Sequence, residues 1–153
     1  MIKIRFATKD DLQEMIELYV DNNPEYGSDK ERLKEGLSAL LDDPNKGYEI
    51  VAVSEGKIIG RIHIAKEWSV YRNAEFWMFE NVYVSPSWRR KGIYTLMHEW
   101  IYSRAKVDSS CCGLRFWALE DNLPARNAYH KMQMEGQIVE LFENDFIFGK
   151  NNP

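Results

Sequence analysis

The sequence predicts an α/β domain, more narrowly an α+β arrangement in three layers with a central sheet between helices. Two observations support this class. Strand-like runs come first, and the later part of the chain then runs strand, helix, strand, helix, strand. Elements in this order form layered folds in which helices pack on a sheet. With 153 residues and no repeat, low-complexity tract or linker, the chain is expected to be one domain, residues 1–153.

The first third of the chain is predicted to form a strand and two helices. The stretch IKIRFA alternates apolar and polar residues and suits a strand. Thr8 can then cap a helix, with Asp11 as its capping-box partner. Ser28 and Glu31 form the same kind of start for a second helix. The apolar faces are Leu12, Met15, Ile16 and Tyr19 in the first helix and Leu33, Leu37, Leu40 and Leu41 in the second.

The middle of the chain is predicted to form three strands and a long helix. Residues 48–68 are typical of two strands joined by a tight turn at Glu55 and Gly56. Residues 75–84 form a further strand. An amphipathic helix follows from about Gly92, with apolar positions at Ile93, Leu96, Met97, Trp100, Ile101 and Ala105.

The last third is predicted to add a strand, a helix and a closing hairpin. Residues 111–119, CCGLRFWAL, are nearly continuously apolar, which is typical of a strand covered on both faces. Residues 137–149 suit a hairpin or a pair of short strands. The helix between them has its apolar positions at Ala125, Ala128, Tyr129 and Met132.

Composition and charge limit the classes of function. Apolar residues make up 44% and charged residues 29%, as in soluble globular proteins. The net charge of −4 disfavours the broad basic surface of a nucleic-acid-binding protein. No apolar stretch reaches the ~20 residues that span a bilayer. No signal pattern opens the chain, so a cytoplasmic protein without membrane contact is expected. Cys111 and Cys112 are adjacent and no histidine completes a zinc site, so no metal is expected.

Three cations, Arg89, Arg90 and Lys91, stand immediately before Gly92, between a strand and a helix. A helix N-terminus presents unpaired N–H groups and the positive end of the helix dipole, so anions bind there. Cations at this end oppose the dipole, and a merely structural turn would not select them. The sequence contains neither a P-loop nor a G-x-G-x-x-G fingerprint. The residues alone leave two alternatives, a solvated basic loop or a site for a polyanion with two or more phosphates.

Residues 84–94, VSPSWRRKGIY, resemble motif A of the GNAT superfamily of N-acetyltransferases, which is written Q/R-x-x-G-x-G/A. Arg89 matches the first position and Gly92 matches the glycine. Tyr94 departs from the motif, because a glycine or alanine is usual there. In the family this loop wraps the pyrophosphate of acetyl-coenzyme A, so the resemblance implies acetyl-CoA as cofactor.

A second segment, residues 120–132, resembles the family pattern N-x-x-A-x-x-x-Y-x-x-x-G. Asn122, Ala125 and Tyr129 fit this pattern, and Gln133 replaces the last glycine. Two motifs in the expected order are more specific than either alone. The stretches ENVYV, GLRFWALEDNLPARNAY and FENDF are most similar to the diamine and thialysine acetyltransferase branch.

The resemblance implies a GNAT-type mixed, mostly antiparallel sheet flanked by about four helices. It also implies that Val82 and Val84 hydrogen-bond the pantetheine arm through their main chain, and that Asn122 contacts the same arm. The cofactor-binding residues expected on this basis are Val82, Tyr83, Val84, Arg89, Arg90, Lys91, Gly92, Ile93, Tyr94, Thr95, Asn122, Ala125 and Tyr129.

Acetyl transfer to an amine requires a base for the amine and a proton donor for the departing thiolate. Strand alternation puts Glu80 on the face of Met78, Val82 and Val84, where apolar neighbours would make it a stronger base. The alternatives are a solvated glutamate at a strand end, a base acting through water, or no dedicated base. Tyr129 is the candidate donor, and the alternative is a core tyrosine.

The sequence therefore predicts an acetyl-CoA-dependent N-acetyltransferase of a small primary amine, such as a polyamine or lysine analogue. Alternatives are an acetyltransferase of a protein amine or an aminoglycoside, and a non-catalytic CoA-binding domain. A nucleic-acid-binding module conflicts with the net charge. The terminal strands could also pair across a two-fold axis in a homodimer. Five residues are a further hypothesis for an acceptor pocket, although aromatic residues are more often core: Trp68, Tyr71, Trp77, Glu67 and Glu75.

Overall fold

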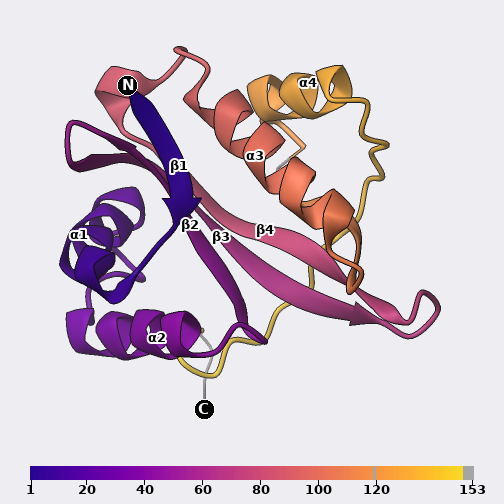
Figure 1. The fold of residues 1–153 in the computed structure, drawn as a ribbon. Helices are drawn as coiled ribbons and strands as arrows, with labels where there is room; N and C mark the ends of the chain where they lie inside the picture. The colour runs from indigo at the N-terminus through magenta and orange to yellow at the C-terminus, as the bar shows by residue number, and fades with distance from the viewer. Residues whose placement is uncertain (119, 150–153) are drawn as a thin grey trace. The chain divides into compact units, whose positions relative to one another are not determined.

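Five strands form one sheet, in the order β1-β2-β3-β4-β5, in a computed structural model that describes residues 1–118 and 120–149 (Figure 1). Neighbouring strands are antiparallel except β4 and β5, which are parallel. The strands are β1 (Ile2–Phe6), β2 (Gly47–Ser54), β3 (Lys57–Ser69), β4 (Ala74–Val84) and β5 (Cys111–Phe116). The helices are α1 (Leu12–Asn22), α2 (Lys30–Asp42), α3 (Ile93–Val107) and α4 (Leu123–Lys131). The predicted mixed, mostly antiparallel sheet with four helices is confirmed.

The chain divides into two compact units, Met1–Phe116 and Trp117–Pro153. The first unit holds the whole sheet and three of the helices, and the second holds α4. The prediction that residues 1–153 form one domain stays a prediction.

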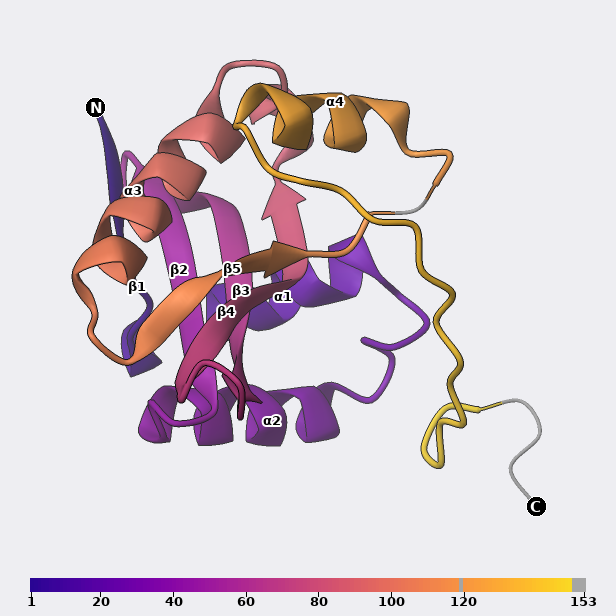
Figure 2. The same ribbon diagram turned by 90° about the vertical axis from the view of Figure 1, so that its right-hand side faces the viewer.

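Within the first unit the helices cover both faces of the sheet, which makes the three predicted layers (Figures 1 and 2). One core lies between the sheet and α3 and contains eleven buried residues, among them Ile62, Phe79 and Met97. The other core, around Met15 and Val51, lies between the sheet and the pair α1 and α2. Each helix therefore buries its apolar stripe against the sheet, and this burial is the main stabilising contribution.

The predicted helix starts are confirmed for the first helix and wrong for the second. A short 3-10 helix, η1 (Lys9–Asp11), precedes α1, and the Thr8 N–H donates to Asp11 Oδ2 at 2.7 Å. At α2 the cap is Asp29, whose Oδ1 accepts from the Arg32 N–H at 3.0 Å, and not Ser28. Asp29 caps better because a carboxylate is an acceptor only and carries the charge that the helix dipole favours.

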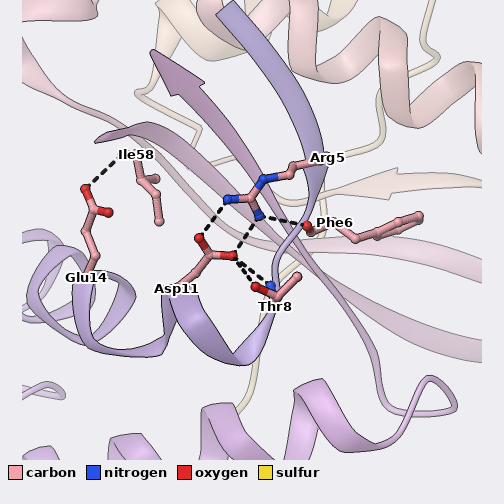
Figure 3. A network of polar contacts seen from close by, with 6 residues as sticks. All are labelled: Arg5, Phe6, Thr8, Asp11, Glu14 and Ile58. Carbon is pink, nitrogen blue, oxygen red and sulfur yellow. Dashed lines mark hydrogen bonds and ion pairs between the residues drawn. The ribbon is translucent and has the colours of Figure 1, made fainter. Parts of the chain in front are cut away.

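Asp11 also ties β1 to the helices, as Figure 3 shows. The Arg5 guanidinium donates to both Asp11 oxygens, at 2.7 and 2.8 Å. These hydrogen bonds hold the pKa of the Asp11 carboxyl below its usual range. Nearby, Glu14 Oε1 accepts from the Ile58 N–H at 2.8 Å, so α1 is also fixed to the start of β3.

The central hairpin and the long helix follow the prediction closely. Glu55 and Gly56 have φ values of 50° and 77° and join β2 to β3, as in the tight turns that favour hairpins. Of the apolar positions expected in the long helix, Leu96 is exposed and the others contact the core.

The prediction for the end of the chain is wrong in the described residues. No strand forms in 137–149, and several apolar side chains there, including Leu141 and Phe142, are exposed. Asp145 Oδ1 accepts from the N–H groups of Ile147 and Phe148, at 2.8 and 2.9 Å. This local turn uses donors that a strand ladder would need, a competition typical of aspartate.

Candidate functional site

The basic segment lies in a strand–loop–helix unit, as predicted. After β4 the chain forms a short 3-10 helix, η2 (Pro86–Trp88), and then turns into α3. The Trp88 N–H donates to the Ser85 carbonyl at 2.8 Å, and Arg89 Nε donates to the Val84 carbonyl at 2.9 Å. The Arg89 side chain therefore folds back on the loop and fixes its shape.

The N-terminus of α3 carries no cap other than the backbone of Gly92. Gly92 has φ 78°, makes no side-chain cap and is followed by no acidic residue in the first turn. The Leu96 N–H donates to the Gly92 carbonyl at 3.0 Å, so the helical bonding starts there. The N–H groups of a first turn have no partner within the helix, and with the dipole they favour an anion.

Arg89, Arg90 and Lys91 are all exposed at this helix end. Arg90 has φ 60°, in the left-handed region that is costly for a non-glycine residue. Left-handed residues in a turn direct successive N–H groups into a concave anion-binding arrangement. The Lys91 ammonium lies 5.3 Å from the centroid of the Trp88 ring. The loop thus combines main-chain donors with three exposed cations, which is the chemistry needed to hold a phosphate-bearing ligand.

The end of β4 offers a second set of main-chain groups. The pairing of β4 with β5 ends at Phe79 and Phe116, so in the described residues β4 continues without β5. The Ser85 N–H donates to the Ile59 carbonyl at 2.9 Å, which directs Ser85 and Tyr83 toward β3. Ladder groups alternate in direction, so those of Val82 and Val84 face away from β3, and of these the Val84 carbonyl already accepts from Arg89 Nε. An extended ligand with amides could bind there as an added strand.

Glu80 lies on a β-bulge, and its predicted burial is wrong. Asn81 lies opposite His63 and Phe79 lies opposite Ile64, so Glu80 has no opposing residue on β3. The extra residue breaks the alternation of side chains between the two faces of β4. Phe79 and Val82 are three positions apart, yet both contact the core between the sheet and α3, here called the α3-side core. The Glu80 side chain is exposed. Its role as a base stays a prediction.

Tyr94, the residue that departs from motif A, packs against the α3-side core. Its ring centroid lies 6.1 Å from that of His98, one turn further along α3. Ile93 is buried, Tyr83 is 8% exposed, and Thr95 is exposed at the first turn. In this segment the predicted cofactor residues that are exposed are therefore Arg89, Arg90, Lys91, Gly92 and Thr95.

The remaining predicted residues lie in the second unit. Asn122 caps α4, because its Oδ1 accepts from the Ala125 N–H at 3.3 Å. Tyr129 lies in the last turn of the same helix and is partly buried. The roles of Asn122, Ala125 and Tyr129 toward a cofactor stay predictions.

The aromatic acceptor pocket does not form as predicted. Trp77 is 2% exposed and belongs to the α3-side core, whereas Tyr71 is 98% exposed. The two acids have cationic partners: Glu67 pairs with Arg115 at 2.6 Å, and Glu75 pairs with Lys66 at 3.6 Å. The alternation of side chains along β4 places Trp77 on the face that α3 covers. Trp77 is therefore separated from Tyr71, which lies at the tip of the hairpin between β3 and β4.

A buried polar network on the α1 and α2 face was not predicted. Glu49 and Arg61 are both fully buried, with 3.5 Å between Glu49 Oε1 and the Arg61 guanidinium. Burial raises the pKa of Glu49 to about 7, against the opposing effects of Arg61 and Tyr19. Burial and the nearby Arg61 lower the pKa of His63 to about 4. The sequence pattern that could have indicated this network is a charged residue within each of two apolar runs, Glu49 in YEIVAV and Arg61 in IIGRIHIA.

In the described part of the chain, no helix is long and apolar enough to cross a membrane. The same residues contain no group of three or more acidic, histidine or cysteine side chains that could hold a metal ion.

Comparisons with known proteins identify the family. The family model described as "Acetyltransferase (GNAT) family" matches residues 12–134. No curated protein matches the chain. Among solved structures, a "possible acetyltransferase" from Clostridium difficile 630 is 29% identical, with a TM-score of 0.82 over 96% of this chain and 99% of that chain.

Two more distant structures share the fold. The aminoglycoside N-acetyltransferase AAC(6')-Iy in complex with CoA is 16% identical, with a TM-score of 0.80 over 95% of each chain. A ribosomal-protein-alanine N-acetyltransferase from Brucella melitensis biovar Abortus 2308 is 16% identical, with a TM-score of 0.76 over 95% of this chain and 99% of that chain. With the family model matched over most of the sequence, the chain belongs to the GNAT family of acetyltransferases.

Proposed function

We propose that this chain is an acetyl-CoA-dependent N-acetyltransferase that acetylates a primary amine of a small molecule, of the polyamine or lysine-analogue type. The observation that carries the proposal is the uncapped start of α3 with its three exposed cations, beside the segment of β4 that β5 leaves unpaired. A neighbouring structure, AAC(6')-Iy, is named as a complex with CoA, which supports the choice of cofactor.

The residues present fit such a cofactor. Arg89, Arg90 and Lys91 and the first-turn N–H groups of α3 would hold its phosphates. The main-chain groups of Val82 and Val84 would bind its amide-bearing arm. When bound, acetyl-CoA supplies an acetyl group activated as a thioester.

The proposed proton transfers use two residues, a base and a proton donor. An alkylamine has a pKa near ~10, so it must lose a proton before it attacks. Glu80, exposed on the β4 bulge, would accept that proton directly or through a water molecule. Tyr129 would donate a proton to the departing thiolate. Asn122 and Ala125 belong to the same motif, and the resemblance assigns them to cofactor binding.

The acceptor is the least constrained part of the proposal. The structural neighbours include enzymes named for aminoglycosides and for a ribosomal-protein alanine, so these acceptors are the main competitors. A non-catalytic CoA-binding domain is a further alternative. A homodimer and a cytoplasmic location stay predictions.

The first experiment measures thermal unfolding with and without CoA. A ligand at ~100 times its dissociation constant should add about 2.7 kcal/mol to the free energy of unfolding. The absence of any shift at millimolar CoA would rule out the cofactor. Thiol release from acetyl-CoA, measured over a panel of polyamines, lysine analogues, aminoglycosides and peptides, then selects the acceptor. Binding of CoA without turnover on any amine would favour the non-catalytic alternative.

The second experiment tests the proton donor. Tyr129→Phe should lower kcat by about 100-fold, the usual contribution of a general acid, with little change in the affinity for CoA. Tyr102→Phe, at an exposed tyrosine of α3, is the matched control and should leave both unchanged. Equal losses of turnover and CoA affinity in Tyr129→Phe would indicate a packing role.

A further inference from the structure

Five polar side chains form a continuous network on the face of the sheet that α1 and α2 cover. The Tyr19 hydroxyl donates to Glu49 Oε2 at 3.0 Å, and the Arg61 guanidinium lies 3.5 Å from Glu49 Oε1. The other end of that guanidinium donates to Asn81 Oδ1 at 3.0 Å. The Asn22 amide donates to the same Oδ1 at 2.9 Å. The network therefore links α1, β2, β3 and β4.

Arg61 is held from several sides at the centre of this network. Its guanidinium carbon lies 3.3 Å from the centroid of the Tyr19 ring and 5.9 Å from that of Tyr83. Its side chain is fully buried, like that of Glu49. A buried ion pair rarely stabilises a fold more than well-packed apolar residues of the same volume would. A gain in the free energy of unfolding therefore does not explain why the network is present. Its position in the sheet indicates another role.

The network ends at the one register shift between β3 and β4. Asn81 is the residue that restores the pairing after the shift, opposite His63, and Glu80 immediately before it is the inserted residue. Bulges redirect side chains, and they need a local constraint because a strand can otherwise slip in register. The Oδ1 atom of Asn81 accepts two hydrogen bonds, one from β3 and one from α1. These bonds fix Asn81 on the covered face, so Glu80 is turned to the surface.

We propose that Asn81 is a positioning residue for acetyl transfer, held by Arg61 and Asn22 so that the β4 bulge presents Glu80 and the strand edge at Val82 in fixed geometry. This inference rests on the proposed function, since it assigns Asn81 to the same site. The side chain acts only as an acceptor in this arrangement. An aspartate at the position would keep that acceptor, whereas a leucine of similar size would remove it.

The experiment compares Asn81→Asp with Asn81→Leu, and adds Asn22→Ala, which removes one donor at an exposed position. We expect kcat to fall at least about tenfold in Asn81→Leu and about threefold in Asn22→Ala, and to stay within about twofold of the wild type in Asn81→Asp. The dissociation constant for CoA should change by a smaller factor than kcat in all three, because the loop before α3 that would hold the phosphates is intact.

A structural role alone predicts different results. Leu37→Ala, in the core beneath α2, is the control that destabilises the protein without touching the network. The pH profile of kcat should move in Asn81→Leu and not in Leu37→Ala. The proposal is overturned if Asn81→Asp loses as much kcat as Asn81→Leu, or if Asn22→Ala and folded Asn81→Leu both keep the wild-type kcat.

Hydrogen exchange separates this inference from the proposed function. Amides of residues 80–84 should exchange about tenfold faster in Asn81→Leu than in Asn81→Asp or the wild type, whether or not an amine is acetylated. A wild type that acetylates no amine would contradict the proposed function, and the exchange rates would still decide whether Asn81 holds the bulge. Equal exchange rates in the variants and the wild type would overturn the positioning role. If Asn81→Leu does not fold, Asn22→Ala provides the same comparison.

Discussion

The two faces of the sheet differ in the kind of polar groups that they hold and in where those groups lie. On the α3 face the buried core cluster of the described residues is apolar, and the uncharged Ser54 and His98 are buried beside it, with the His98 ring 5.5 Å from that of Phe116. The groups offered to a ligand beside this face are main-chain ones at the end of β4 and the start of α3, together with the three exposed cations before α3. On the other face, Glu49 and Arg61 are buried within the core itself.

This difference determines what each face can tolerate. Main-chain groups depend on backbone conformation, so almost any side chain that keeps the conformation will serve. Buried charged side chains depend on their partners, because removing one leaves the other without compensation. The α3 side should therefore be sensitive to changes in φ and in surface charge, and the opposite side to the loss of single partners.

The largest effect is expected on the α1 and α2 face. Arg61→Met leaves Glu49 buried without its counter-charge and should lower the free energy of unfolding by about 3–5 kcal/mol. The double variant Arg61→Met/Glu49→Leu should recover most of this loss, because no buried charge remains. Urea unfolding at pH 8, above the pKa of Glu49, measures both.

The opposite face supplies the comparison for that experiment. Met97→Ala, in the α3-side core, should cost about 2–5 kcal/mol, and no second substitution of a charged residue should restore it. If the double variant were no more stable than Arg61→Met, the two charges would not be coupled, and the contrast between the faces would fail.

A smaller effect is expected in the pH dependence of stability. Folding raises the pKa of Glu49 from 4.5 to about 7, so the folded state keeps a proton that the unfolded state releases. Its contribution to stability therefore falls as the pH rises from about 4.5 to about 7. Folding lowers the pKa of His63 from 6.5 to about 4, so its contribution rises with pH between about 4 and 6.5.

These two contributions oppose each other in the wild type, and single variants separate them. Relative to the wild type, Glu49→Gln should become more stable as the pH rises, and His63→Gln should become less stable, each by at most about 3 kcal/mol over its window. Thermal unfolding between pH 4 and pH 8 measures the differences. Curves that stay parallel to the wild type would show that neither group changes its protonation on folding.

The sequence predicted the α3 side of the site better than the side with the buried charges. The loop before α3 was predicted from four contiguous residues, Arg89 to Gly92. Three of them are cations at a helix N-terminus, where they oppose the helix dipole, so the pattern is visible without any tertiary contact. Glu80 was placed on the wrong face because alternation assumes a regular ladder, and the bulge depends on partners in β3. Arg61, Glu49 and Asn22 are distant in sequence, and no local pattern indicates that they meet.

The smallest effect on the free energy of unfolding is expected in the loop before α3. Two variants there separate the contribution of charge from that of backbone conformation. Arg90 has φ 60°, whereas Lys91 is not among the described residues with positive φ. Arg90→Gly should raise the free energy of unfolding by about 0.5 kcal/mol, because glycine adopts this conformation without strain. Lys91→Gly removes the same charge at the next position and should lower it by about 0.5–1 kcal/mol.

Both glycine variants should weaken CoA binding by a similar factor, and more at low salt than at high salt, because each loses one cation near the phosphates. Isothermal titration at two salt concentrations measures the affinity, and urea unfolding measures the stability. Opposite changes in stability with equal losses of affinity would show that the loop binds through charge on a backbone that glycine can also adopt. If Arg90→Gly kept full affinity while Lys91→Gly lost it, Arg90 would serve the conformation of the loop and not the ligand.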